Sequence, residues 1–199
     1  MDIFIATFLK MFFIMTPFFV LSVFLTVTQD ATSEQKKSLA IKVTLSVIIT
    51  SLILVFFGQH IFKIFGITLD AFRIGAGALL FLSAVELVKG NKDSGKVGNK
   101  DISQLAVVPL AIPVTIGPGT IGILLVMGAT FDNTSSMIMG SLALICAVLV
   151  IGIMLYTSSI IEKVLGKQGL LVISKITGLF LAALSAQIMF TGIKNFLGL

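Results

Sequence analysis

The sequence contains no tryptophan, one histidine and one cysteine among its 199 residues. The single cysteine, Cys146, cannot form an intrachain disulfide, and one cysteine with one histidine cannot supply the ligands of a zinc site. No glycine-rich loop followed by lysine is present to hold a nucleotide phosphate, and no nucleophile has a base placed near it. The sequence therefore predicts no enzyme, no catalytic residue, no metal and no cofactor.

Charged residues are also scarce, at 12% of the chain, whereas soluble domains carry about 25%. Hydrophobic residues make up 57% of the sequence, and the mean hydropathy is +1.13. The net charge of +5 comes from lysines that lie mainly between apolar segments, so it indicates membrane orientation and not nucleic-acid binding. The composition predicts an integral membrane protein in contact with the lipid bilayer, with no nucleic-acid partner.

Six apolar segments are long enough to cross a bilayer as helices, which takes about 20 residues. Such continuous runs are not typical of membrane β-strands, which have about ten residues of alternating polarity. The first segment follows an acidic residue, Asp2, and exceeds the length of a signal-peptide core, so we expect it to be retained. We predict an all-α polytopic protein with six transmembrane helices. The predicted spans are 4–28, 41–62, 68–88, 104–129, 136–161 and 170–196.

The basic residues predict how these spans are oriented. If both termini lie outside, ten of the 14 lysines and arginines fall on the cytoplasmic side, as the positive-inside rule requires. The polar, glycine-containing segment 89–103 is then a cytoplasmic linker. Only four basic residues fall on the outer side: Lys10, Lys63, Arg73 and Lys194.

The two halves of the chain resemble each other. The segment GAGALLFLSA (75–84) is similar to TGLFLAALSA (177–186) at an offset of 102 residues, and Pro17 precedes Pro118 by 101. A repeat of three helices must enter the membrane from the opposite side in its second copy. The sequence therefore predicts two inverted repeats, 1–88 and 104–199, joined by the linker; chance similarity between apolar helices is the alternative.

Two of the predicted spans are broken near their middle by proline, the first at Thr16-Pro17 and the fourth at Gly117-Pro118-Gly119-Thr120. Proline cannot donate to the helix and displaces the carbonyl four residues earlier, which here belongs to Phe13 or Val114. Paired breaks at corresponding places in two repeats are typical of transporter binding sites.

Four segments of the chain resemble the MarC family of bacterial inner-membrane proteins, also grouped as small neutral amino acid transporters. They are TPFFVLSVFL (16–25), FGITLDAFRIGAGALLFLSA (65–84), VVPLAIPVTIGPGTI (107–121) and KITGLFLAALSAQIMFTGIK (175–194). The resemblance implies six membrane helices and transport or export of glycine or alanine across the inner membrane. In the first segment the family usually has Asn-Pro-x-Gly-x-x-Pro, whereas this chain has Thr16 in place of the asparagine, Phe19 in place of the glycine and Ser22 in place of the second proline.

We expect the substrate site at the two breaks. The free N–H groups and the helix dipole at Gly119 and Thr120 suit a carboxylate, and glycine at 117 and 119 allows a close approach. Thr16 offers a hydroxyl at the first break. The absence of charged residues near the span centres favours a net-neutral substrate. The predicted substrate-binding residues are Thr16, Pro17, Gly117, Pro118, Gly119, Thr120, Ser83, Ser185 and Gln187.

Each of these predictions has a simpler alternative. The prolines can act only as kinks, Ser83 and Ser185 only as small packing residues, and Gln187 only as an interhelical hydrogen-bonding residue. Glu86 is the candidate for proton coupling, although it can equally pair with Lys89 at the membrane surface. The coupling ion or proton and the oligomeric state are left open. The alternative function is a non-transporting membrane protein that acts as an assembly or regulatory partner.

Overall fold

A computed structural model describes residues 2–89, 107–131 and 133–198, and all regular secondary structure in these ranges is helical. The all-α prediction is therefore confirmed for the described part of the chain. The elements are α1 (Asp2–Ile14), α2 (Pro17–Val27), α3 (Ser33–Phe65), α4 (Leu69–Lys89), the π-helix η2 (Val107–Thr115), α5 (Pro118–Ala129), α6 (Thr134–Tyr156) and α7 (Ser158–Leu197).

Four helices, α3, α4, α6 and α7, are each long and apolar enough to cross a membrane, and the bent pair α1 and α2 makes a fifth candidate span. The elements η2 and α5 occupy most of the fourth predicted span. The number of six spans stays a prediction. Beyond Lys89, the predicted linker 89–103 lies outside the described residues.

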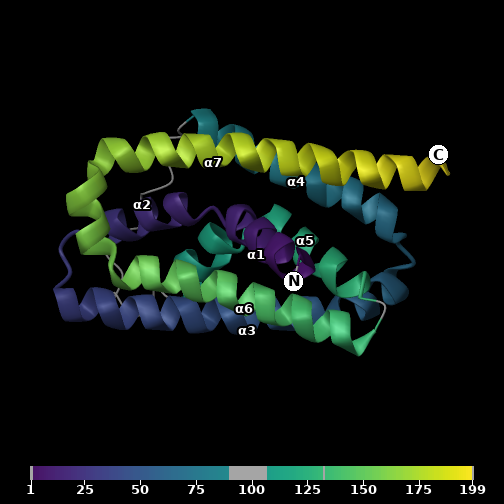
Figure 1. Cartoon of the computed structure of the whole chain (residues 1–199), viewed down its shortest axis with the longest axis horizontal. Helices are drawn as coiled ribbons and strands as arrows, with labels where there is room; N and C mark the ends of the chain where they lie inside the picture. Colours follow the sequence, from purple (N-terminus) through teal and green to yellow (C-terminus); the bar gives the residue numbers. More distant parts are fainter. Residues whose placement is uncertain (1, 90–106, 132, 199) are drawn as a thin grey trace.

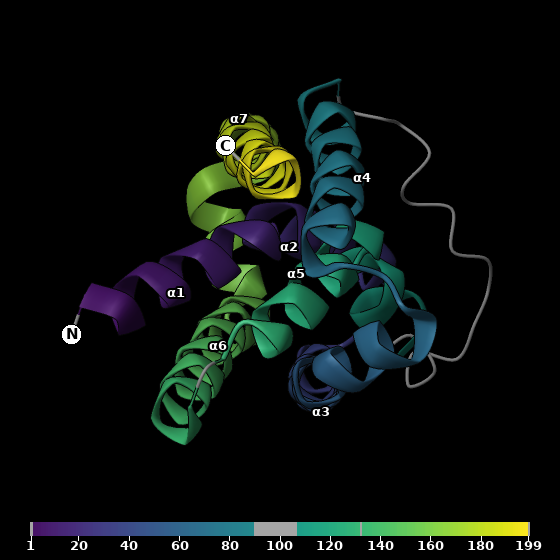
Figure 2. The ribbon, with the colours of Figure 1, turned by 90° about the vertical axis from the view of Figure 1, so that its right-hand side faces the viewer.

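The helices form three layers, which Figures 1 and 2 show from two directions. Helices α4 and α7 lie side by side in one outer layer, and α3 and α6 form the other. The broken helices α1, α2 and α5 run between them. The two helix breaks are therefore placed in the middle layer, with protein on both sides.

Two helices begin earlier than the apolar runs predicted. Helix α3 starts at Ser33 and not near residue 41, because Thr32 and Gln35 form a capping box that supports a polar first turn. Its 33 residues extend over about 50 Å, more than the bilayer core requires. Helix α7 starts at Ser158 and is kinked at Gly166, where φ is 66°, so the predicted loop before residue 170 is largely helical.

The α4–α7 layer is held together by small residues. A Cβ atom added at Gly77 would lie 2.6 Å from Met189 Cγ, and one added at Gly178 would lie 3.1 Å from the Ala84 carbonyl oxygen. The later residue of α4 thus pairs with the earlier residue of α7, so the two helices are antiparallel. Close backbone approach through small residues is a common way for helices to associate in membranes.

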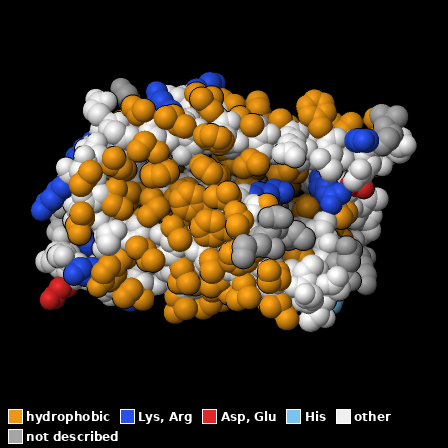
Figure 3. All heavy atoms as spheres, viewed as in Figure 1, with side chains coloured by type: hydrophobic (Ala, Val, Ile, Leu, Met, Phe, Trp, Pro, Cys, Tyr) orange, Lys and Arg blue, Asp and Glu red, His pale blue; other side chains and the backbone are white. Residues whose placement is uncertain are grey.

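Large apolar side chains cover much of the outside of the molecule. On α3, four of them are spaced by four residues and each is at least half exposed: Ile41, Leu45, Ile49 and Ile53. Figure 3 shows hydrophobic side chains across one face, with basic side chains mainly near its edges and a few within it. A continuous apolar surface of this kind requires a partner, and lipid is the partner that the length and hydropathy of these helices predict.

Candidate functional site

The first break has an unusual backbone at Thr16. Its φ of 48° and ψ of 59° are left-handed, and among the described residues every other positive φ belongs to glycine. A β-branched residue in this conformation is strained, at a cost of about 1–3 kcal/mol. The chain bends by 40° between α1 and α2 at this point.

The carbonyl that Pro17 displaces does not stay unpaired. The Thr16 N–H donates to the Phe13 carbonyl oxygen at 3.0 Å, and the Val20 N–H donates to the Thr16 carbonyl oxygen at 3.0 Å. The Phe13 carbonyl that the proline displaces therefore has a donor within the protein.

The second break has a different backbone. The chain arrives as the π-helix η2, in which the Ile116 N–H donates to the Ala111 carbonyl oxygen at 2.9 Å and the Thr115 hydroxyl donates to the Leu110 carbonyl oxygen at 2.7 Å. Gly117 is then extended, with φ of −75° and ψ of 173°, and α5 begins at Pro118. π-Helical segments within membrane or soluble helices often occur at functional sites.

The start of α5 offers unpaired donors, as the sequence predicts. The first helical bond is donated by the Ile121 N–H to the Gly117 carbonyl oxygen at 2.9 Å. The N–H groups of Gly119 and Thr120 have no acceptor among the described residues. Such a helix end carries a partial positive charge and is suited to an anion.

The two threonines at the breaks differ from the other buried threonines in their hydrogen bonds. Five threonines are buried, and three of them, Thr28, Thr115 and Thr177, donate to a carbonyl of their own helix. The other two are Thr16, which is 8% exposed, and Thr120, which is 4% exposed. Their hydroxyls have no hydrogen-bond partner among the described residues. Neither threonine oxygen is fully buried; within the described ranges, the fully buried hydroxyls without a partner belong to Ser51, Ser141, Ser158 and Ser174. The hydroxyls of Thr16 and Thr120 are therefore free to bind a polar ligand or water.

Gly119 has a structural role that the sequence analysis did not anticipate. A Cβ atom there would lie 2.7 Å from both Cα and N of Leu80, so α5 is seated directly on the backbone of α4. The side of Gly119 that was predicted to face a ligand is thus occupied by protein. Gly117 is half-buried, Pro17 is buried and Pro118 is exposed.

The three candidates on α4 and α7 lie in different surroundings. Ser83 donates to the Leu79 carbonyl oxygen at 3.1 Å, and the fully buried Ser185 donates to the Ala182 carbonyl oxygen at 2.7 Å. Ser185 also faces Gly77 across the α4–α7 contact. Both hydroxyls are used within their own helices, which favours packing. Gln187 is exposed and lines a cavity whose lining includes none of the residues at the two breaks.

This cavity was not predicted. It has a volume of about 630 Å³ and lies between α1, α5 and α7, with one residue of α4 at its rim, Arg73. Lys10 lines it from α1. One feature of the sequence could have indicated this cavity: Lys10 and Arg73 are two of the four basic residues on the predicted outer side. Within the described ranges, no group of three or more histidine, cysteine, aspartate or glutamate residues is placed to hold a metal ion.

Comparison with known proteins identifies the group to which this architecture belongs. Residues 1–197 match the profile of MarC family integral membrane proteins. The chain belongs to the MarC family. The resemblance that the four sequence segments carry is therefore confirmed, and the membrane location with it.

Relatives of this MarC family chain cover it almost from end to end. It is 32% identical to a UPF0056 membrane protein of Aquifex aeolicus, over 98% of this chain and 94% of the relative. It is 34% identical to a UPF0056 membrane protein of Pyrococcus horikoshii, over 98% and 96% of the two chains. It is also 30% identical to the UPF0056 membrane protein YhcE of Escherichia coli, over 94% and 90%. No solved structure matches the chain significantly.

Proposed function

We propose that this MarC family protein is a secondary transporter or exporter of small neutral amino acids, such as glycine and alanine. The observation that carries the proposal is the pair of broken helices in the middle layer. Each break buries a threonine whose hydroxyl has no partner among the described residues. Thr120 also lies in the first turn of α5, whose first N–H groups are free of backbone acceptors. Discontinuous spans with free helix ends are typical of transporter binding sites.

The contacts between elements support two inverted repeats. The first part of each broken helix contacts the middle helix of the other half, since α1 contacts α6 and η2 contacts α3. The second part contacts the last helix of the other half, since α2 contacts α7 and α5 contacts α4. These four contacts are what a twofold relation between 1–88 and 104–199 would produce. The match is partial, because α5 also packs closely on α3 whereas α2 contacts α6 only sparsely. Alternating access would then be a rocking of one repeat against the other.

The chemistry of the breaks suits a zwitterion without a charged side chain. The N–H groups of Gly119 and Thr120 would hold the carboxylate, with the Thr120 hydroxyl as a further donor. The α-ammonium would bind to oxygen acceptors, for which the Thr16 hydroxyl and the Val114 carbonyl are candidates. The seating of α5 on Leu80 leaves little free volume beside Gly119, which favours the smallest amino acids.

We place the protein in the bacterial inner membrane with both termini outside. The Escherichia coli relative supports a bacterial membrane location, and the distribution of basic residues supports the orientation. A coupling ion or a proton would complete the cycle, and Glu86 is the candidate proton carrier.

The alternative is a protein that acts by association with an assembly or regulatory partner. It is favoured by Ser83 and Ser185, whose hydroxyls are used within their own helices, and by Gly119, which serves helix packing. In that case the breaks are kinks, the protein carries no amino acid flux, and substitutions of the free hydroxyls should leave the association with the partner unchanged.

Flux measurements on reconstituted vesicles test the proposal. We expect the wild-type protein to carry labelled glycine or alanine, and Thr120→Val to reduce the flux by about tenfold or more, because one hydrogen bond to a charged group contributes about 1.5–3 kcal/mol. Thr120→Ser should retain transport. Thr177→Val is the matched control, because Thr177 is equally buried but its hydroxyl already donates to the Ile173 carbonyl.

Two results would contradict the proposal. One is the absence of flux for a panel of neutral amino acids with well-folded, reconstituted protein. The other is an equal effect of Thr120→Val and Thr177→Val, which would show that the loss comes from packing and not from the free hydroxyl.

A further inference from the structure

The cavity between α1, α5 and α7 is a second candidate binding site, separate from the residues at the breaks. Its volume of about 630 Å³ is within the range of pockets that hold drug-sized ligands, roughly 300–1,000 Å³, and is far larger than glycine or alanine requires. It arises because α1 packs mainly on α6 and contacts α7 only sparsely. The cavity therefore calls for a ligand larger than the proposed transport substrate.

One end of the cavity is basic and rich in hydrogen-bond donors. Arg73 Nη1 donates to Asp70 Oδ1 at 2.7 Å, and Asn195 Nδ2 donates to the same oxygen at 3.2 Å. Asp70 is thus fixed beside Arg73, whose guanidinium has five N–H donors in all. Most of these donors have no acceptor among the described residues, and the Lys10 ammonium likewise has none there. Lys10 and Arg73 carry two positive charges, and Asp70 carries one negative charge. This end of the cavity is therefore suited to an anion.

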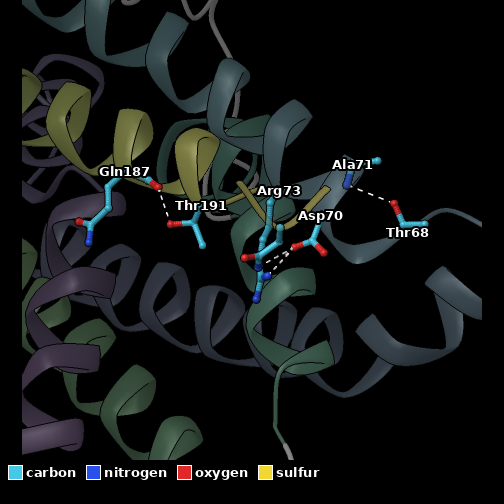
Figure 4. A network of polar contacts seen from close by, with 7 residues as sticks. Thr68, Asp70, Ala71, Arg73, Gln187 and Thr191 are labelled. Atoms are coloured by element: carbon cyan, nitrogen blue, oxygen red, sulfur yellow. Dashed lines mark hydrogen bonds and ion pairs between the residues drawn. The ribbon is translucent and has the colours of Figure 1, made fainter. Parts of the chain in front are cut away.

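Further polar groups point to the same side. Figure 4 shows the Gln187 amide, the Thr191 hydroxyl and the Arg73 guanidinium extending in the same direction from α7 and α4. The Thr191 hydroxyl donates to the Gln187 backbone carbonyl at 2.8 Å, so its oxygen can still accept. Both residues line the cavity with Lys10 and Arg73.

The rest of the cavity wall is apolar. Phe13 of α1 and Phe180 of α7 stack on each other and form part of this wall, with ring centroids 5.2 Å apart and planes inclined by 28°. Leu184, Ile123 and Met127 continue the wall. An apolar wall that leads to a basic end is complementary to an apolar chain with an anionic headgroup.

We propose that this cavity binds an anionic amphiphile, with its carboxylate or phosphate between Lys10 and Arg73 and its apolar chain along Phe13, Phe180 and Leu184. A free long-chain carboxylate and an anionic bilayer lipid share this chemistry. The binding does not rest on the proposed amino acid transport, because none of the break residues lines the cavity.

The cavity can be probed with one engineered thiol, since Cys146 is the only cysteine of the chain. In a Cys146→Ala background, Leu184→Cys places the thiol on the cavity wall. The rate of its alkylation by a water-soluble maleimide is measured in phosphatidylcholine nanodiscs, with dodecanoate or with the uncharged dodecanol. We expect dodecanoate at ten times its dissociation constant to slow alkylation by about tenfold through mass action, and dodecanol to leave the rate unchanged.

Charge variants locate the headgroup. Lys10→Gln and Arg73→Gln should each raise the dissociation constant of dodecanoate about tenfold, the effect of losing a charge-assisted hydrogen bond. At the same dodecanoate concentration, the slowing of alkylation should then fall to about twofold. Arg73→Lys should keep most of the protection, which guards against misfolding of the glutamine variant. Lys194→Gln is the matched control, because Lys194 is a basic residue near the same end of α7 that does not line the cavity.

A second arm distinguishes the two sources of the ligand. Slower alkylation in phosphatidylglycerol nanodiscs without dodecanoate would identify the bilayer lipid, whereas an unchanged rate with protection by dodecanoate would identify a free carboxylate. Equal protection by dodecanol, full protection in both glutamine variants, or no protection by either the lipid or dodecanoate would each overturn the proposal.

Discussion

The two helix breaks reach a similar outcome with opposite backbone solutions. At Thr16 the chain turns within one residue through a strained left-handed conformation, and the freed Phe13 carbonyl is paired at once. At Gly117 the chain widens into a π-helix beforehand and then passes through an unstrained extended residue. The first break has a strained backbone whose freed carbonyl is hydrogen-bonded. The second break has an unstrained backbone, but the N–H groups of Gly119 and Thr120 have no acceptor among the described residues. A ligand-binding role therefore fits the second break best, and the first is better suited to shaping what lies beside it.

The largest effect on stability should come from the contact that fixes the second break. Gly119→Ala would place a methyl group 2.7 Å from the Leu80 backbone, and overpacking of this kind costs about 1–3 kcal/mol. We expect a lower thermal unfolding midpoint in detergent.

Gly75→Ala is the control for this substitution, because a Cβ atom at Gly75 would meet nothing within 4 Å. Its helix propensity should make it neutral or stabilising by up to about 1 kcal/mol. Equal midpoints for the two variants would show that α5 is not anchored through Gly119.

The next effect should be a gain in stability at the first break. Asparagine tolerates the left-handed region far better than a β-branched residue, so Thr16→Asn should stabilise the protein by about 1 kcal/mol. Thermal unfolding measures the shift.

The same change at the second break should have the opposite sign. Thr115→Asn would remove the hydroxyl that donates to the Leu110 carbonyl oxygen within η2, at a residue that needs no left-handed backbone. A loss of stability in both variants would contradict the assignment of strain to Thr16.

The smallest effect should come from exchanging each threonine for valine, which keeps the β-branch and removes only the hydroxyl. Thr115→Val loses the 2.7 Å bond to Leu110 and should cost about 0.5–1.5 kcal/mol. Thr16→Val should leave stability unchanged, because the Thr16 hydroxyl has no partner among the described residues. Reversible unfolding in mixed micelles can resolve the difference, and equal losses would mean that Thr16 is hydrogen-bonded in the folded protein.

The apolar runs were sufficient to predict much of the fold. The third span was predicted at 68–88, and α4 covers Leu69–Lys89. Helix starts were predicted less well, because the polar first turn of α3 is supported by a capping box and α7 continues through a kink at Gly166. Hydropathy does not respond to either of these effects.

The candidate site, too, could be predicted only in part from the sequence. Proline chemistry located both breaks, since a missing donor has a local consequence that can be derived from the sequence. Whether a serine donates within its own helix, as Ser185 does, depends on its rotamer and its neighbours. The π-helix and the cavity depend on how distant helices pack, so no local pattern indicates them.

The end of α6 offers a natural optical probe. Tyr156 is its last residue, and the Lys37 Nζ of α3 lies 5.4 Å from the centroid of the phenol ring. The chain contains one tyrosine and no tryptophan. Ultraviolet emission from the unmodified protein therefore comes almost entirely from this one ring, and any motion that separates α3 from the α6–α7 connection should change its intensity without a label.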